Sequence, residues 1–193
     1  MGNTTVIIIV AALIAVAAIA LACWMQMKKK QTMRLRSTYG PEYDRLTEIE
    51  GSQGGAEKTL HQREKRVERF NLVPLSPEDR DRFAEAWRQE QAGFVDDPRS
   101  AVANADMLVT EVMQARGYPM GDFEQRAADI SVNHPHVVKN YRIAHAIALR
   151  DSRGETGTED LRTALLHYRM LFEDLLTGHA AEPENQQSEA VRA

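Results

Sequence analysis

The chain opens with 20 consecutive apolar residues, Val6 to Met25, and continues with apolar and polar positions that alternate at helical spacing. At about 1.5 Å per residue, a helix of that length would cover about 30 Å, which is the thickness of the hydrocarbon core of a bilayer. The pattern predicts a single N-terminal transmembrane helix, with a transmembrane anchor over residues 1–27. A cleaved secretory signal fits less well, since it needs a basic start and a shorter apolar core.

Basic side chains follow the apolar run and predict a juxtamembrane segment over residues 28–38. Basic flanks of a membrane helix stay in the cytoplasm, so we expect the N-terminus outside and the rest of the chain on the cytoplasmic face of the plasma membrane. The same side chains would attract anionic lipid at the membrane surface. They are Lys28, Lys29, Lys30, Arg34 and Arg36.

Two alternatives concern the same segment. Cys23 follows a small residue near the end of the apolar run, which leaves open an exported domain, either secreted or a lipoprotein. Small side chains also recur at spacings of four, three and four, and would allow a second helix to approach closely in a homo-oligomer. These helix-association candidates are Ala11, Ala15, Ala18 and Ala22.

Residues 39–75 are predicted to form a charged helical stalk and a linker. Pro41 can occupy the first position of a helix, and the apolar residues that follow have heptad spacing typical of a coiled coil. Arg63 falls on a core position of that repeat, and glycines at 51, 54 and 55 weaken a continuous helix. We therefore expect two helices with a glycine hinge, followed by an extended connector over residues 71–75, where Pro74 disfavours helix.

Five helix starts are recognisable in residues 76–178, one of them at residues 133–135 before Val137. Ser76, Asp97 and Asp122 can cap helices, and Thr158 precedes two acids in a first turn. Residues 137–149 are apolar nearly all round and predict the most buried helix. The fold class predicted is all-α, with an antiparallel bundle of four to five helices over residues 76–178 and a disordered tail over residues 179–193.

Charge is distributed unevenly along the chain. The whole protein carries a formal net charge of -4, but residues 1–36 hold five basic and no acidic side chains, so that the remainder is strongly acidic. Nucleic-acid affinity rests on basic groups that neutralise phosphates, and this remainder has no basic cluster with interleaved aromatics. The pattern argues against a nucleic-acid partner. With one cysteine, the chain cannot form an internal disulfide.

Candidate chemistry is sparse. His134 and His136, near Glu124 and Asp129, are the best metal candidates, but their spacing matches no established metal motif. His145 could act as a general base if a cleft reached it, but the sequence favours a core histidine with satisfied hydrogen bonds. The sequence offers no catalytic residue, no cofactor-binding motif and therefore no cofactor.

Exposed apolar side chains indicate a protein partner. Met107, Leu166 and Met170 fall off the main apolar faces of their predicted helices and would need a cover. Together with anchor and stalk, this predicts a non-enzymatic, membrane-tethered helical domain that docks a protein partner or forms a homo-oligomer. The alternatives are a small metal- or ligand-binding helical enzyme that uses His134, His136 or His145, and the exported domain.

The chain resembles an uncharacterised family of bacterial proteins that have an N-terminal hydrophobic anchor and a small helical domain. The resemblance implies a bacterial source, and hence an inner-membrane location, together with a shared fold. It implies no activity, ligand or catalytic residue. The resembling stretches are residues 39–45, 63–70, 74–78, 94–98, 121–126 and 141–145.

Overall fold

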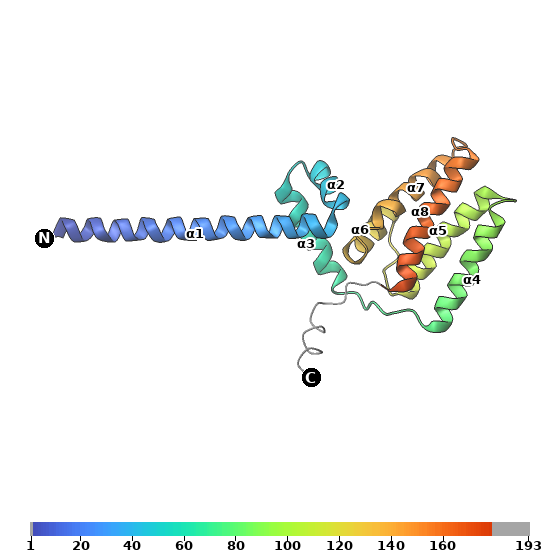
Figure 1. The fold of residues 1–193 in the computed structure, drawn as a ribbon, viewed down its shortest axis with the longest axis horizontal. Coiled ribbons are helices and arrows are strands. Elements are labelled where there is room, and N and C mark those ends of the chain that lie inside the picture. Colours follow the sequence, from blue (N-terminus) through green and yellow to red (C-terminus); the bar gives the residue numbers. More distant parts are fainter. Residues whose placement is uncertain (1, 179–193) are drawn as a thin grey trace.

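The computed structural model describes residues 2–178, with side chains at residue 13 and from residue 15 onward. Every regular element in that range is an α-helix, so the predicted all-α class is confirmed at this level (Figure 1). The helices are α1 (Gly2–Tyr39), α2 (Pro41–Glu50), α3 (Gln53–Val67), α4 (Pro77–Gly93), α5 (Pro98–Ala115), α6 (Phe123–Asn133), α7 (Val138–Asp151) and α8 (Thr158–Thr177). The predicted tail, residues 179–193, lies outside the described residues.

The prediction of a membrane anchor is contradicted. Among the helices of residues 2–178, none combines the length and the apolar character that a bilayer crossing requires. The basic residues from Lys28 continue the same helix as the apolar residues before them. This finding contradicts the predicted transmembrane anchor. It also contradicts the single-pass inner-membrane location and the orientation that were derived from that anchor. The earlier part of the predicted span lies outside the described side chains.

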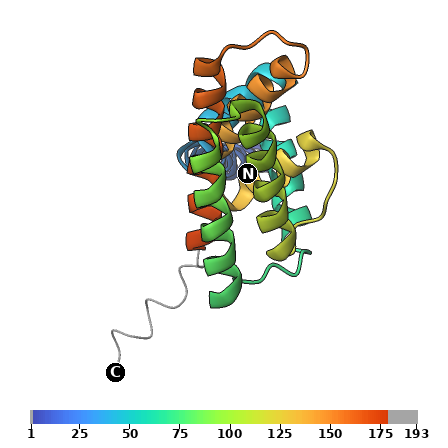
Figure 2. The same ribbon diagram turned by 90° about the vertical axis from the view of Figure 1, so that its right-hand side faces the viewer.

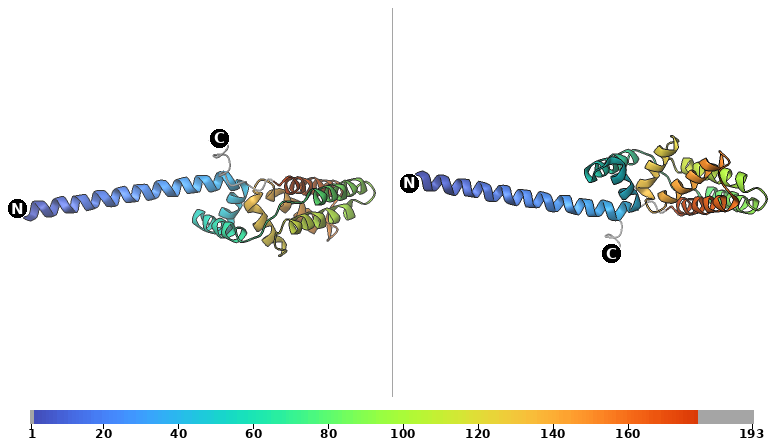
Figure 3. Two further views of the ribbon diagram at one scale, coloured as in Figure 1. Left: turned by 90° about the horizontal axis from the view of Figure 1, so that it is seen from below. Right: turned by 90° about the horizontal axis from the view of Figure 1, so that it is seen from above.

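Helix α1 projects from one end of the molecule, and its last turns contact α2 and α3 (Figures 1 and 3). There Thr32 donates a hydrogen bond to Glu57 of α3, and Tyr39 donates one to Glu64 at 2.9 Å. Gly40, whose φ of 45° favours glycine, ends the helix, and Pro41 opens α2 as predicted. The C-terminal turns of α1 thus belong to a folded unit, whereas the rest extends away from it.

Helices α2 and α3 form a hairpin, which confirms the expected break between two helices. Gly51 ends α2 with a φ of 65°, and the Ser52 hydroxyl accepts a hydrogen bond from the amide of Gly55 to start α3. The two later glycines lie inside α3 rather than in the hinge. One face of the hairpin and the end of α1 share a small apolar core. This differs from a solvated stalk, because the core buries Leu35, Tyr39, Tyr43, Leu46, Ala56 and Leu60.

Five helices, α4 to α8, form the predicted bundle, and its main core is separate from that of the hairpin. Figure 2 shows α4 and α5 side by side in the end-on view. Ser76, Asp97 and Asp122 cap α4, α5 and α6 as predicted, each accepting a hydrogen bond from an amide three residues on. Trp87 of α4 stacks on Phe172 of α8, with 4.6 Å between ring centroids.

The most buried helices are α5 and α8, not the helix predicted at residues 137–149. Each of these two buries seven side chains, whereas α7 buries four. Helix α7 begins at Val138 and presents part of its surface to α2 and to solvent. The apolar residues of α7 therefore suit a helix that lies between the hairpin and the bundle, and not only a helix inside a core.

The connector between hairpin and bundle, residues 71–75, lies outside the helices, as predicted. The amide of Val73 donates a hydrogen bond to the carbonyl of Arg116 at 3.0 Å. Gly117 lies beside it with a φ of 89°, and a Cβ at this position would approach the Asn71 carbonyl oxygen to 2.5 Å. The end of α5 therefore requires glycine where the connector passes.

Candidate functional site

The hairpin meets the bundle through charged side chains. The side chain of Glu42 of α2 is only 2% exposed and accepts a hydrogen bond from Arg63 of α3 at 2.8 Å. Arg142 of α7 lies 3.3 Å from the same carboxylate oxygen, and Arg45 lies 3.4 Å from it. A buried carboxylate without such partners would be strongly unfavourable, so Glu42 and these arginines hold one another in place.

A second carboxylate shares two of these arginines. Glu124 of α6 accepts a hydrogen bond from Arg142 at 2.7 Å and one from Arg45 at 3.4 Å. Burial raises the pKa of Glu124, but its hydrogen bond to Arg142 and the charges of Arg142 and Arg45 outweigh this effect, so its pKa lies below the usual value. Unlike Glu42, the Glu124 side chain is 67% exposed. It is ionised at neutral pH and accessible from solvent.

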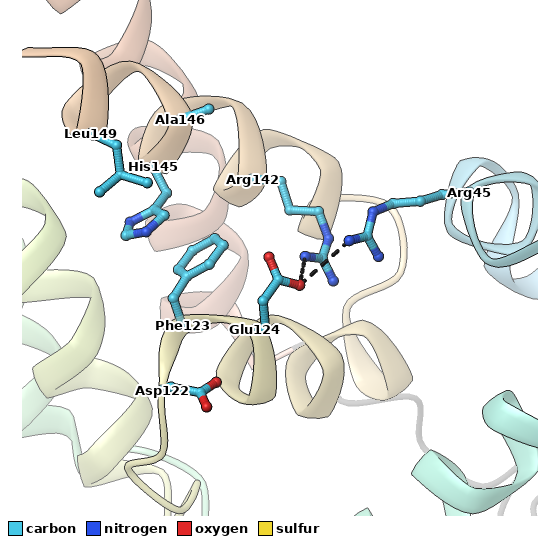
Figure 4. Close-up of a pocket in the computed structure, with 8 residues that line it drawn as sticks. All are labelled: Arg45, Asp122, Phe123, Glu124, Arg142, His145, Ala146 and Leu149. Carbon is cyan, nitrogen blue, oxygen red and sulfur yellow. Dashed lines mark hydrogen bonds and ion pairs between the residues drawn. The ribbon is translucent and has the colours of Figure 1, made fainter. Parts of the chain in front are cut away.

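A pocket of about 540 Å³ opens between α2, α6 and α7 (Figure 4). In Figure 4, Glu124 points toward Arg142 and Arg45 on one side, while His145 and Leu149 lie on the other, beyond the ring of Phe123. The pocket thus has a charged half and an apolar, aromatic half. The eight lining residues are Arg45, Asp122, Phe123, Glu124, Arg142, His145, Ala146 and Leu149.

A smaller pocket of about 310 Å³ adjoins the first and shares Arg45 and Arg142 with it. Its lining includes Lys139 of α7 and Glu48 of α2. The two arginines therefore line both hollows along the junction.

His145 lies in the wall of the larger pocket. Its ring stacks on Phe123 with 3.5 Å between centroids and 8° between planes. Burial lowers the pKa of His145 below its usual value, and the charge of Asp106 opposes that effect only in part. Nδ1 is buried without a hydrogen-bond partner, which contradicts the interpretation of His145 as a core histidine with satisfied hydrogen bonds. The ring is neutral at pH 7 and offers an aromatic face to the pocket.

The structure does not bring the two metal candidates together. His134 is buried, its Nδ1 lies 2.5 Å from Asp174 of α8, and its Nε2 lies 3.5 Å from Arg116. His136 is exposed. Within the described part of the chain, no group of three or more His, Cys, Asp or Glu side chains is placed to hold a metal ion. His134 instead joins the ends of α5, α6 and α8, because Arg116 also donates to the Leu175 carbonyl at 3.0 Å.

Three of the five side chains predicted to lie at a membrane surface contact other side chains of the protein. Arg34 pairs with Glu64 at 3.6 Å, and Arg36 pairs with Asp44 at 3.4 Å. Lys28 lies over the ring of Trp24. Lys29 and Lys30 are exposed on α1.

The helix-association candidates lie on the projecting part of α1. Ala15, Ala18 and Ala22 are exposed there, and Ala11 lies outside the described side chains. Cys23 is also exposed in this helix. Association through these alanines stays a prediction.

The apolar side chains expected to need a cover are exposed as predicted. Met107 of α5 is 56% exposed, and Leu166 and Met170 of α8 are exposed to a similar degree. They lie on the bundle and are not part of the pocket lining.

Sequence reasoning missed the residues of the junction. Glu42, Arg45 and Arg142 had no motif and no spacing that set them apart from other surface charges. One signal did exist, since Arg63 occupied an apolar position of the heptad pattern. Its side chain is in fact largely buried against Glu42 and donates to Ser131 of α6 at 3.1 Å.

No protein-family model matches the chain, and no curated protein and no solved structure matches it. The resemblance to an uncharacterised bacterial family stays a prediction. Class and function are therefore argued from the site alone.

Proposed function

We propose that this chain is a non-enzymatic helical docking protein, which binds a segment of a protein partner in the pocket between α2, α6 and α7. The observation that carries the proposal is the division of that pocket into a charged half and an apolar half. A protein segment presents both kinds of side chain within a few residues, and so fits a surface of this kind.

The charged half is preorganised for recognition. Glu42 is buried and fixes the guanidinium groups of Arg142 and Arg45 near the pocket. Arginine presents a planar fork of donors, and holding that fork in place before binding lowers the entropy lost in the complex. Arg142 is only 13% exposed, so its position depends little on solvent-side motion.

The apolar half offers contact area. Leu149 is 49% exposed and Ala146 is exposed, both on α7 beside the stacked rings of His145 and Phe123. Burying exposed apolar area contributes about 25 cal/mol per Å², and aromatic rings are frequent anchors of interfaces. An apolar side chain of the partner that covers Leu149 would gain such energy.

A second candidate is a small ligand-binding enzyme that uses His145. Its support is the unpartnered Nδ1 and the lowered pKa, because a neutral imidazole beside a pocket can accept a proton. The two candidates differ in what His145 does. A docking protein needs only its ring face, so His145→Phe would preserve binding, whereas an enzyme would lose its activity.

Site-specific crosslinking in the cells that naturally make the protein tests the docking proposal. A photoreactive amino acid replaces Leu149 in the full chain, and a matched control replaces Val95, which is 86% exposed and lies between α4 and α5. We expect a discrete adduct with another protein from position 149 and not from position 95. The adduct should weaken severalfold when Arg142→Gln is added.

Three results would contradict the proposal. They are adducts of equal yield from both positions, no adduct from position 149, or an adduct that Arg142→Gln leaves unchanged. An adduct with a second copy of the chain would identify the partner as the protein itself.

A further inference from the structure

Glu124 binds two arginines in the charged half of the pocket, and another carboxylate could take its place there. We propose that the partner segment carries an acidic side chain which displaces Glu124 from Arg142 and Arg45, and an apolar side chain which covers Ala146 and Leu149. This inference rests on the docking function proposed above and names the chemistry of the partner.

The charges at the junction favour this exchange. Three arginines, at positions 45, 63 and 142, face two carboxylates, those of Glu42 and Glu124. Glu42 is buried, and moving it away would leave the neighbouring arginines partly buried without a compensating negative charge. Glu124 is largely exposed and can turn into water, where a carboxylate is well solvated. A partner carboxylate that takes its place keeps the charge balance of the junction unchanged.

The hydrogen bonds of Arg142 show which contact a partner could replace. Nη2 binds Glu42, which is buried, and Nη1 binds Glu124, which is exposed. Glu124 reaches Arg142 through Nη1 alone, so a partner carboxylate has to replace one charge-assisted hydrogen bond there.

The spacing of α7 sets the distance between the two groups of the partner. Arg142, Ala146 and Leu149 follow one another at intervals of four and three residues, which places them on one face of the helix. At about 1.5 Å per residue, Leu149 lies about 10 Å along the helix from Arg142. A segment in the polyproline II conformation rises about 3.1 Å per residue and completes one turn in three residues, so side chains three positions apart lie on one face about 9 Å from each other. The expected partner motif is an acidic residue with an apolar residue three positions away.

Titration of the full chain with blocked tetrapeptides tests this inference. The probe is acetyl-Glu-Ala-Ala-Leu-amide, the neutral comparison is acetyl-Gln-Ala-Ala-Leu-amide, and a third peptide has Gln with a free C-terminal carboxylate. Binding is followed by nuclear magnetic resonance shifts of the α6 and α7 amides. We expect the glutamate peptide to bind about tenfold more tightly than the blocked glutamine peptide, and to weaken as salt is added.

Variants give changes of opposite sign, which unfolding alone cannot produce. Glu124→Gln removes the internal competitor and should strengthen binding of the glutamate peptide severalfold. Arg142→Gln should abolish the preference for glutamate over glutamine. Glu159→Gln is the matched control, because Glu159 is an exposed acid paired with Arg162 on α8, and it should change nothing. A melting curve for each variant confirms that it is folded.

The outcomes separate this inference from the docking function. Equal binding of the blocked peptides, or weaker binding to Glu124→Gln, overturns the inference while leaving the crosslinking result intact. Tighter binding of the glutamine peptide with the free C-terminus also overturns the inference, because the carboxylate that the site recognises would then be a chain terminus and not an acidic side chain. Peptide binding as expected, together with no adduct at position 149, would support the carboxylate site and contradict protein docking.

Discussion

Replacing Glu42 by glutamine should loosen the hairpin from the bundle. Glutamine keeps the shape and one acceptor oxygen, but it removes the negative charge that Arg63, Arg142 and Arg45 surround. Removing one partner of a buried ion pair typically costs about 3–5 kcal/mol, since the remaining charge stays buried without compensation. Arg45 is partly exposed, and Arg142 retains Glu124, so part of the loss is recovered. We expect a decrease of about 3 kcal/mol in the free energy of docking.

Hydrogen exchange of backbone amides measures this change region by region. The hairpin and the bundle have separate apolar cores, so amides of α2 and α3 should exchange faster in Glu42→Gln, while those of α5 and α8 should hardly change. Glu48→Gln on the same helix is the control, because Glu48 is exposed, and its effect should stay within about 0.5 kcal/mol. A loss below about 1 kcal/mol in Glu42→Gln, or equal acceleration in both units, would refute the view that buried charge holds the units together.

Three further predictions concern other parts of the molecule. The pKa of His145 is lowered in the folded state, so the unfolded chain binds a proton at this residue more readily. The free energy of unfolding should therefore fall as the pH decreases from about 6.5 toward the folded pKa. In a profile of melting temperature against pH, His145→Gln should flatten that part of the curve. Gly117→Ala should destabilise the chain by about 1–3 kcal/mol in urea, because the new Cβ meets the Asn71 carbonyl and φ is positive; a neutral result would exclude a close approach there. Asp174→Asn leaves buried His134 with a weaker partner and should cost about 1–3 kcal/mol in urea, which an unchanged midpoint would contradict.

Local signals in the sequence predicted much of the fold correctly. Ser76, Asp97 and Asp122 cap helices where expected, Pro41 opens one, and the break near Gly51 separates two. Each of these effects acts between residues at most four positions apart. Backbone preference and capping therefore determine where helices begin and end, whatever lies around them.

Two predictions were wrong: the choice of residues 137–149 as the most buried helix, and the membrane anchor. Both were drawn from apolar runs alone. An apolar run shows that a helix avoids water, but it does not show what surrounds the helix. Residues 137–149 indicated the most buried helix, yet α5 and α8 bury more side chains because neighbours cover them on more sides. The apolar segment of α1 continues into basic turns that pair with α2 and α3.

The candidate site depends on contacts between distant parts of the chain. Glu42 and Arg142 are 100 positions apart, and Arg63 and Ser131 are 68 apart. In the sequence each is one charge or hydroxyl among many on helices that all have polar faces. Packing of the hairpin against α6 and α7 buries Glu42 beside its arginines and leaves Glu124 accessible, because that packing alone decides which polar faces lose contact with water.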